Sequence, residues 1–324
     1  MKKKLFFGCI LFSILLIGMT SCEKDPTPPV CDFTYVADGL TVTFTSASTD
    51  ASTYLWDFGD GETSTEVNPV HVYAGEGDFD VVLTATGDGG TDSKEETVNV
   101  IASLEDVKNF LTGGSGDANG KTWVLDTTNY EGDGASAVEP SMLVLIPVPA
   151  DFFAWMGREK LDAYKDEFTF KYDGSYSINS QNDTIVGISL FAFFNNVTAL
   201  NSNTPYGTCR ITPFVQPAGA TWTLHDEDFT VDAITNPSEI AIPPAHGNVT
   251  FSGKKWLSFS AGSYFGYLDF TTSSHILIKS ISATEMKVAL MFCMYLGAAD
   301  PSGTGIPYAN LPTHIFHMTF KAKP

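Results

Sequence analysis

Paired carboxylates are the catalytic groups of most glycosidases, and this sequence lacks their usual pairing. A Glu-x-Asp-x-x-Glu string on one strand would put a nucleophile and an acid on the same face, about 5 Å apart. The chain contains no such string. Its acidic cluster at 226–228 is typical of a solvated turn, and the cluster at 131–133 lies in a glycine-rich loop without an obvious partner in sequence. We therefore expect the chain not to be an enzyme; an endo-acting glycoside hydrolase using Glu131 or Glu139 is the alternative.

Motifs for metal binding and for nucleophilic catalysis are also missing from the sequence. The six histidines are scattered, and no HExxH, HxH or GxSxG pattern occurs. Cys31, Cys209 and Cys293 form no CxxC spacing, and they can give either one disulfide and one thiol or three buried thiols. The sequence therefore predicts neither a zinc site nor a serine triad, and we expect no cofactor.

Aromatic residues in polar loops favour a different chemistry, the binding of sugars. The C–H faces of a sugar stack on exposed rings, while carboxylates, amides and arginine hydrogen-bond its hydroxyl groups. Trp155 lies among aromatic and polar residues, although the same pattern fits a core position beneath a short helix. The predicted glycan-binding residues are Trp155, its neighbours and two loop tyrosines: Trp155, Tyr130, Tyr206, Phe153, Asp151 and Arg158.

The first 30 residues indicate export and a membrane tether. Lysines at 2–4 precede an apolar run that is too short for an ordinary membrane span and is typical of a secretory signal. The run ends in Met-Thr-Ser followed by Cys22, which resembles the lipobox of bacterial lipoproteins. The resemblance implies a lipoprotein signal peptide over 1–21 and lipid on Cys22, which would anchor the chain in a membrane. Residues 22–30 then form a proline-rich tether; a plain secretory signal is the alternative.

The charge of the chain excludes a nucleic-acid partner. The 324 residues include 18 Lys and Arg against 38 Asp and Glu, a formal net charge of −20, and such a chain repels a phosphate backbone. Charged residues make up only 17% and aromatic residues 13%, a balance more typical of secreted β-rich proteins than of helical or disordered ones. We expect a lipid-anchored protein of the outer membrane at the cell surface. Whether the anchor faces outward or into the periplasm stays open.

A first domain is predicted from 31 to 102. Short alternating strands separated by Gly, Asp and Asn turns favour a small β-sandwich there. The stretches WDFGDG at 56–61, NPVHVY at 68–73 and GDFDV at 77–81 resemble the polycystic-kidney-disease-type (PKD) domain. The resemblance implies a seven-stranded immunoglobulin-like sandwich that serves as a spacer or an interaction module rather than as a catalyst.

The WDFGDG motif also contains carboxylates that could hold an ion. Trp56 and Phe58 alternate toward one face, Asp57 toward the other, and the glycines permit a tight turn. Asp60 and Glu62 complete a set of oxygen ligands of the kind that calcium prefers. A structural calcium ion stays open here, although in this family the motif is mainly a turn determinant.

The rest of the chain is predicted to be β after one short helix. Residues 103–120 should form a helix, capped by Ser103, and a glycine-rich linker. Residues 121–324 then show strand alternation, including a hairpin about Asp173-Gly174, and fit a two-sheet jelly roll. A further helix is credible only near 151–166. The expected fold class is all-β: an immunoglobulin-like PKD sandwich followed by a larger jelly-roll or lectin-like sandwich.

A second, looser resemblance concerns this larger domain. The stretches LTGG at 111–114, KTWVLD at 121–126, DGSY at 173–176, ATWTL at 220–224 and FGY at 265–267 occur in this order. Together they resemble the lectin-like domain of PKD-containing surface lipoproteins encoded with polysaccharide-utilization systems. The resemblance implies binding of a β-glucan or a related glycan, with a neighbouring outer-membrane glycan transporter as partner.

The expected function is therefore non-catalytic binding of polysaccharide or oligosaccharide at the cell surface. The relatives carry a Gly-Pro loop and paired tryptophans where this chain has Glu139-Pro140 and Phe152-Phe153-Ala154-Trp155, so the glycan itself stays open. An adhesin or assembly partner that uses the PKD domain is a further alternative. The oligomeric state is not predicted.

Overall fold

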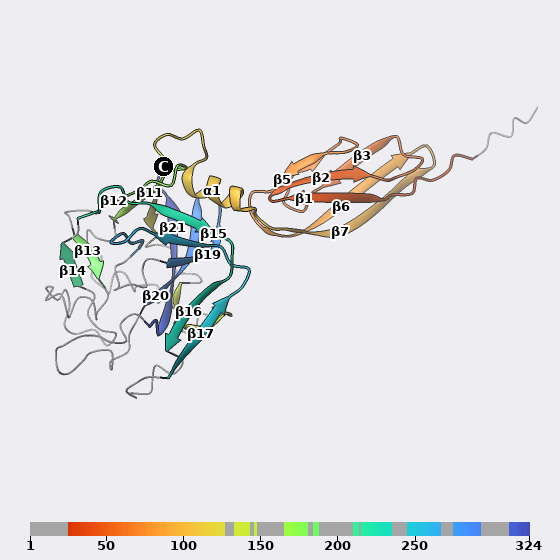
Figure 1. Ribbon diagram of the computed structural model, residues 1–324. Coiled ribbons are helices and arrows are strands. Elements are labelled where there is room, and N and C mark those ends of the chain that lie inside the picture. Colours follow the sequence, from red (N-terminus) through yellow and green to blue (C-terminus); the bar gives the residue numbers. More distant parts are fainter. Residues whose placement is uncertain are drawn as a thin grey trace, which may run out of the picture. The chain divides into compact units, whose positions relative to one another are not determined.

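The computed structural model is built almost entirely of β-strands, which confirms the all-β prediction (Figure 1). It describes residues 25–126, 133–142, 146–147, 165–180, 184–187, 210–213, 215–234, 245–266, 275–292 and 311–324. The predicted signal peptide, Cys22 and all but the last two residues of the helix expected near 151–166 lie outside these residues. Among the described helices, none is long and apolar enough to span a membrane.

Two compact units divide the chain, and their boundary runs through the amino-terminal sandwich. The first unit holds 1–35, 44–69 and 80–97, and the second holds 36–43, 70–79 and 98–324. The predicted domain boundaries at 31, 102 and 121 remain predictions.

The amino-terminal sandwich consists of seven strands in two sheets within the described residues. One sheet has the order β1-β2-β5 and the other β4-β3-β6-β7. The strands are β1 (Phe33–Asp38), β2 (Thr41–Ser46), β3 (Thr53–Asp57), β4 (Thr63–Ser64), β5 (Val70–Val72), β6 (Gly77–Gly87) and β7 (Gly90–Val100).

The WDFGDG motif builds the core and one turn of this sandwich. Trp56 is fully buried, its ring lies 5.1 Å from that of Phe33, and its indole N–H donates to the carbonyl of Glu66 at 2.9 Å. Gly59 has a φ of 80°, and a side chain there would meet the carbonyl oxygen of Asp80.

The motif's aspartates form the turn itself. Asp57 Oδ1 accepts from the backbone N–H of Gly59 and Asp60 Oδ1 from that of Glu62, both at 3.0 Å. These are the bonds by which aspartates stabilise their own turns. Across the described residues, no group of three or more His, Cys, Asp or Glu side chains is arranged to hold a metal ion.

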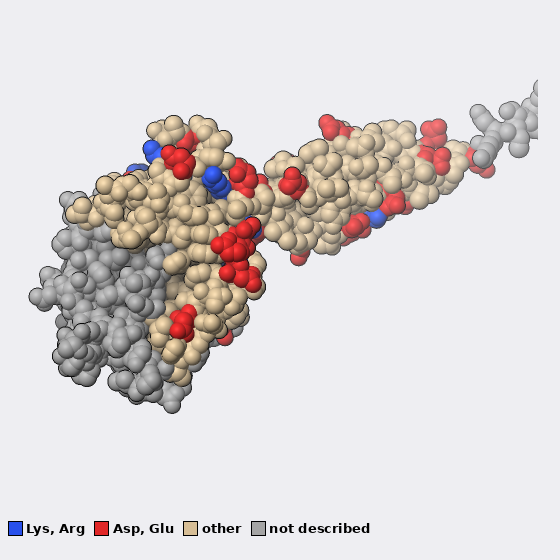
Figure 2. Space-filling model, in the orientation of Figure 1, with Lys and Arg blue, Asp and Glu red and all other residues tan. Residues whose placement is uncertain are grey.

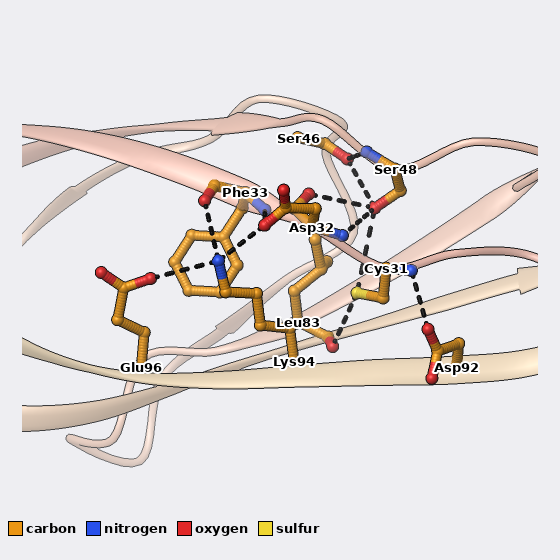
Figure 3. Close-up of polar contacts among 9 residues, drawn as sticks. All are labelled: Cys31, Asp32, Phe33, Ser46, Ser48, Leu83, Asp92, Lys94 and Glu96. Atoms are coloured by element: carbon orange, nitrogen blue, oxygen red, sulfur yellow. Dashed lines mark hydrogen bonds and ion pairs between the residues drawn. The ribbon is translucent and has the colours of Figure 1, made fainter.

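A single lysine connects the first strand of the sandwich to its last. Lys94 Nζ on β7 lies 2.6 Å from Asp32 Oδ1 and 3.4 Å from Glu96 Oε2, above the ring of Phe33 (Figure 3). The hydrogen bond from Lys94, and then the one from the backbone N–H of Phe33, lowers the pKa of the Asp32 carboxyl group. Residues 31–102 contain fourteen Asp and Glu and no other Lys or Arg.

Buried Cys31 begins the sandwich just before this lysine cluster. Its thiol donates to the carbonyl of Leu83 at 3.2 Å, and its backbone N–H donates to Asp92 Oδ2 at 2.8 Å (Figure 3). Cys31 is a free thiol; Cys209 and Cys293, whose pairing the sequence leaves open, lie outside the described residues.

Helix α1 (Leu104–Thr112) forms as the sequence predicts. Ser103 and Asp106 make a reciprocal capping box, and Gly113, with a φ of 83°, ends the helix. The carbonyl of Leu111 accepts from the indole N–H of buried Trp123 at 2.9 Å, and Glu105 accepts from the hydroxyl of Tyr172 at 2.6 Å. These bonds hold α1 against the strands that follow it.

The larger sandwich is built on one long antiparallel sheet, the main sheet, with the order β12-β11-β8-β21-β20-β19-β18-β15; β9 pairs with β21 and with β10. Its strands are β8 (Lys121–Leu125), β9 (Gly134–Ala137), β10 (Ile146–Pro147), β11 (Glu167–Phe170), β12 (Tyr176–Asn179), β15 (Trp222–His225), β18 (Trp256–Phe259), β19 (His275–Ile281), β20 (Glu285–Phe292) and β21 (His314–Ala322). The hairpin predicted about Asp173-Gly174 is confirmed as β11 and β12.

The main sheet curls until its two ends meet. Thr221 beside β15 bridges to Ser175 beside β12, and the N–H of Trp222 donates to the carbonyl of Gly174 at 3.0 Å. Aromatic rings fill the inside of the curl: the ring of Phe170 lies 5.6 Å from that of Trp222, and Phe265 lies 4.3 Å from Phe320. The curl thus follows from burying one aromatic face.

A second layer covers part of the outer face of the main sheet. The strands β16 (Phe229–Ile234) and β17 (His246–Phe251) form a hairpin, and their inward rings pack on Leu277, Ala289 and Ile315. A separate pair joins β13 (Thr184–Gly187) to β14 (Arg210–Pro213).

Replacing Lys94 by glutamine should lower the melting temperature of the sandwich, because it removes the one cation among fourteen carboxylates. The drop should shrink as NaCl is added, since salt screens the remaining repulsion. Glu66→Gln is the matched control: it removes a carboxylate that does not pair with Lys94, and it should not lower the melting temperature. An equal drop for Lys94→Gln at all salt concentrations would show that the lysine acts by packing alone.

Candidate functional site

All six predicted glycan-binding residues lie outside the described residues, so the structure places none of them. They are Tyr130, Asp151, Phe153, Trp155, Arg158 and Tyr206. The strands that bracket most of them are described. Tyr130 falls between β8 and β9, and the four residues from 151 to 158 fall between β10 and β11.

The strand ends next to these two segments lie side by side. β8 and β11 pair antiparallel, with Val124 opposite Glu167. The last residue of β8 therefore adjoins the residue before β11. We call this place the strand-end site and define it by three buried aspartates and one buried threonine: Asp126, Asp133, Asp166 and Thr319.

Thr319 on β21 holds both sides of the gap between β8 and β9. Its carbonyl accepts from the backbone N–H of Asp126 at 2.9 Å. Its own N–H donates to Asp133 Oδ2 at 3.2 Å, and its hydroxyl donates to Asp133 Oδ1 at 2.7 Å. One residue thus fixes the two points between which residues 127–132 run.

The carboxyl group of Asp133 has a raised pKa. Burial raises its pKa to about 6, opposed by the two hydrogen bonds from Thr319 and by the charges of Lys279 and Lys287. Because the folded state then binds the proton more tightly than the unfolded state, the stability contributed by this group is greatest below about pH 4. It is lost as the pH rises through about 6.

Asp126 and Asp166 are each engaged by a different partner. Asp126 Oδ2 lies 2.9 Å from Lys321 Nζ, and this hydrogen bond raises the pKa of Lys321. Asp166 Oδ2 accepts from the hydroxyl of Tyr264 at 3.0 Å, while the carbonyl of Tyr264 accepts from the hydroxyl of Tyr176 at 2.7 Å. Burial raises the pKa of both tyrosines, so both remain donors at neutral pH.

A buried histidine completes this side of the main sheet. His317 Nε2 lies 2.8 Å from Ser136 Oγ on β9, and no hydrogen-bond partner from the described residues meets its Nδ1. Burial, and then the charge of Lys279, lowers the pKa of His317 to about 4, so the ring is neutral at physiological pH. The site is therefore a rigid, polar base with its carboxylates already engaged, suited to holding chain segments in place.

Sequence reasoning predicted part of this arrangement and missed the rest. Strand alternation predicts core positions for Trp123, Trp222 and Trp256; Trp123 and Trp222 are buried, whereas Trp256 is only half-buried. Thr319 and Tyr264 were not singled out. The signal for Thr319 is a lone hydroxyl residue in an apolar strand, between Met318 and Phe320.

Thr319→Val should raise the pKa of Asp133 above about 6, because it removes a hydrogen bond to the carboxylate and leaves the burial unchanged. Carboxyl-detected NMR of protein labelled at aspartate measures this directly. Thr122→Val, whose hydroxyl bonds Thr169 instead, should leave the pKa of Asp133 unchanged. If the pKa of Asp133 were unchanged in Thr319→Val, the hydrogen bonds from Thr319 would not be what holds this carboxylate.

Comparison with known proteins identifies the amino-terminal part of the chain. The family model of the PKD domain matches residues 23–102. Collagenase ColQ1 of Bacillus cereus is 66% identical over 44 residues, which is 14% of this chain and 5% of that protein. Collagenase ColA of Bacillus cereus is 36% identical over 94 residues, covering 26% of this chain and 10% of that protein. The chain thus spans at most a tenth of the length of these relatives.

Two solved structures give weaker likenesses. The PKD1 domain of Vibrio anguillarum Epp is 35% identical, over 24% of this chain and 99% of that domain, with a TM-score of 0.24. Carbohydrate-binding modules from the β-sandwich superfamily are 13% identical over 91% of this chain and 92% of that one, also with a TM-score of 0.24. Neither score supports an argument about the larger domain. The family match and the identity to its relatives show that the amino-terminal sandwich is a PKD domain, followed here by a larger β-sandwich.

Proposed function

We propose that this chain is a lipid-anchored, outer-membrane protein that binds a polysaccharide or oligosaccharide without cleaving its glycosidic bonds. A β-glucan-like chain is the proposed ligand, held by the larger sandwich for a polysaccharide-utilization system. Cys22 would carry the lipid, and a neighbouring outer-membrane transporter would receive the glycan.

The observation that carries this proposal is the pairing of β8 with β11. It brings together the strand ends next to two segments that hold five of the six predicted glycan-binding residues. The buried bonds of Thr319 and Tyr264 hold the described ends of those segments. A preorganised base lowers the entropy cost of binding, which is what a shallow site for a hydroxyl-rich ligand needs.

The PKD domain has a supporting role in this proposal. Its fourteen carboxylates and single lysine make it a soluble, self-repelling module, as a spacer above a membrane requires. A protein with such a spacer could present a binding site beyond the membrane surface. The Pro-rich residues 22–30 would add reach to the spacer.

An adhesin or assembly function is a second candidate, and one sheet face favours it. On the outer face of β1-β2-β5, Thr41 pairs with Val72 and Thr43 with Val70; Val36, Val70 and Val72 are 71%, 61% and 63% exposed. Figure 2 shows few charges on the broad side of this sandwich and Asp and Glu along its margins. Cross-linking on intact cells would test this, because a Val36→Lys, Val70→Lys, Val72→Lys variant should lose its partners.

Trp155→Ala should weaken the binding of long β-glucans by at least about tenfold and leave the melting temperature nearly unchanged, because stacking on an exposed ring would be lost. Affinity electrophoresis of the full chain against a panel of polysaccharides measures the loss. Trp222→Phe is the matched control: its indole is buried and donates to Lys171, so its melting temperature should fall while glycan retention persists. A large drop in melting temperature for Trp155→Ala would assign that residue to the core instead.

A further inference from the structure

We propose that Ser258 is an activated nucleophile, served by His225 and Glu227, that takes the acyl group from small carboxylic esters. The three side chains form a continuous chain of hydrogen bonds at one edge of the main sheet. Ser258 Oγ lies 2.8 Å from His225 Nε2, and His225 Nδ1 lies 2.9 Å from Glu227 Oε1. This order of hydroxyl, imidazole and carboxylate is the arrangement that activates serine in acyl transfer.

The proton positions in this relay follow from chemistry. A carboxylate can only accept, so Nδ1 of His225 carries the ring proton and Nε2 accepts from the hydroxyl of Ser258. A hydrogen bond from the backbone N–H of Glu227, and then the one from His225, lowers the pKa of the Glu227 carboxyl. Glu227 is therefore ionised at neutral pH and fixes the tautomer that can accept a proton from serine.

Trp256 holds two members of the relay in place. Its indole stacks on the ring of His225 with 3.8 Å between centroids and 8° between planes. Its N–H donates to the carbonyl of Glu227 at 2.9 Å, which fixes the turn that carries this carboxylate. An imidazolium formed during attack would lie against the face of the indole, where a cation is stabilised.

The acidic turn is pinned from its other side as well. Asp228 Oδ2 accepts from the hydroxyl of Ser252 at 2.7 Å, and Asp228 Oδ1 accepts from the N–H of Gly253 at 3.2 Å. Glu227 itself is 62% exposed, but its backbone is held by these bonds and by Trp256. The turn is thus a positioned part of the fold.

Two donors flank Ser258 on the same face of the sheet. Thr223 on β15 and His275 on β19 each lie directly opposite Ser258 in the register. Burial, and then the charge of His225, lowers the pKa of His275, so its ring is neutral at pH 7 and can donate an N–H. Thr223 is exposed and Ser258 is half-buried within the described residues, so solvent reaches this end of the face. Side-chain donors here would stabilise the oxyanion in place of backbone N–H groups.

The reaction balances without a cofactor. Ser258 Oγ forms a bond to the ester carbonyl carbon as its proton passes to His225 Nε2. The alcohol then leaves with that proton, and the acyl group stays on Ser258. Water, deprotonated by His225, cleaves the acyl-serine to a carboxylic acid and restores the hydroxyl. This chemistry leaves glycosidic bonds intact, so it adds to the proposed glycan binding and revises the expectation that the chain is not an enzyme.

The test uses the full chain with a fluorophosphonate probe, which phosphonylates activated serines with loss of fluoride. Mass spectrometry of the peptides should find the adduct on Ser258. His225→Gln should slow labelling by about 10²- to 10⁴-fold, the usual contribution of a general base. Turnover of 4-nitrophenyl acetate should fall in parallel and be lost in Ser258→Ala.

Two further variants make the result decisive. Ser280→Ala removes an exposed hydroxyl from the neighbouring strand β19 and should label at the wild-type rate. Glu227→Gln changes an exposed side chain without disturbing its backbone bonds, and should slow labelling at least about tenfold by weakening its hold on the tautomer. Wild-type protein without an adduct on Ser258, or labelling at equal rates in wild type and Glu227→Gln, would overturn the proposal.

Discussion

The pairing of β8 with β11 on one side and with β21 on the other is the constraint on which the larger sandwich depends. It sets Val124 opposite Glu167 and Leu125 opposite Phe320, and so decides which strand ends meet. The pairing is held from within by aromatic burial: Phe168 lies 6.1 Å from Phe320 and 4.8 Å from Phe265. A shift of the pairing by one residue would turn these rings out of the core, so a register displaced by one residue is strongly disfavoured.

Polar groups buried along this register give the packed sheet the base on which the proposed binding site would rest. Thr319 and Tyr264 are themselves buried, and each donates a hydrogen bond to a buried aspartate. Unpaired, such carboxylates would destabilise the fold, so their bonds specify where the neighbouring segments begin and end. The same principle operates at β15 and β18, where Trp256 fixes both His225 and the turn at Glu227.

Local patterns in the sequence predicted the elements, and pairs distant in sequence decided the sites. The WDFGDG turn, the Ser103 cap and the Asp173-Gly174 hairpin are all set by neighbours within a few residues, and all three are confirmed. The relay of Ser258 and His225 joins residues 33 apart, and Thr319 reaches Asp133 across 186 residues. Such contacts arise from the pairing of strands that are distant in sequence, which alternation alone does not predict.

The central claim is that the strand-end site supports a bound glycan, and NMR of the amide-labelled full chain tests it most directly. Adding a β-glucan oligosaccharide that the protein retains should change the chemical shifts of the backbone amides of Asp126, Asp133, Asp166 and Thr319. The chemical shifts of amides in the PKD core, such as those of Val42 and Leu83, should not change. Shifts confined to residues 31–102, with the four strand-end amides unmoved at saturation, would contradict the account.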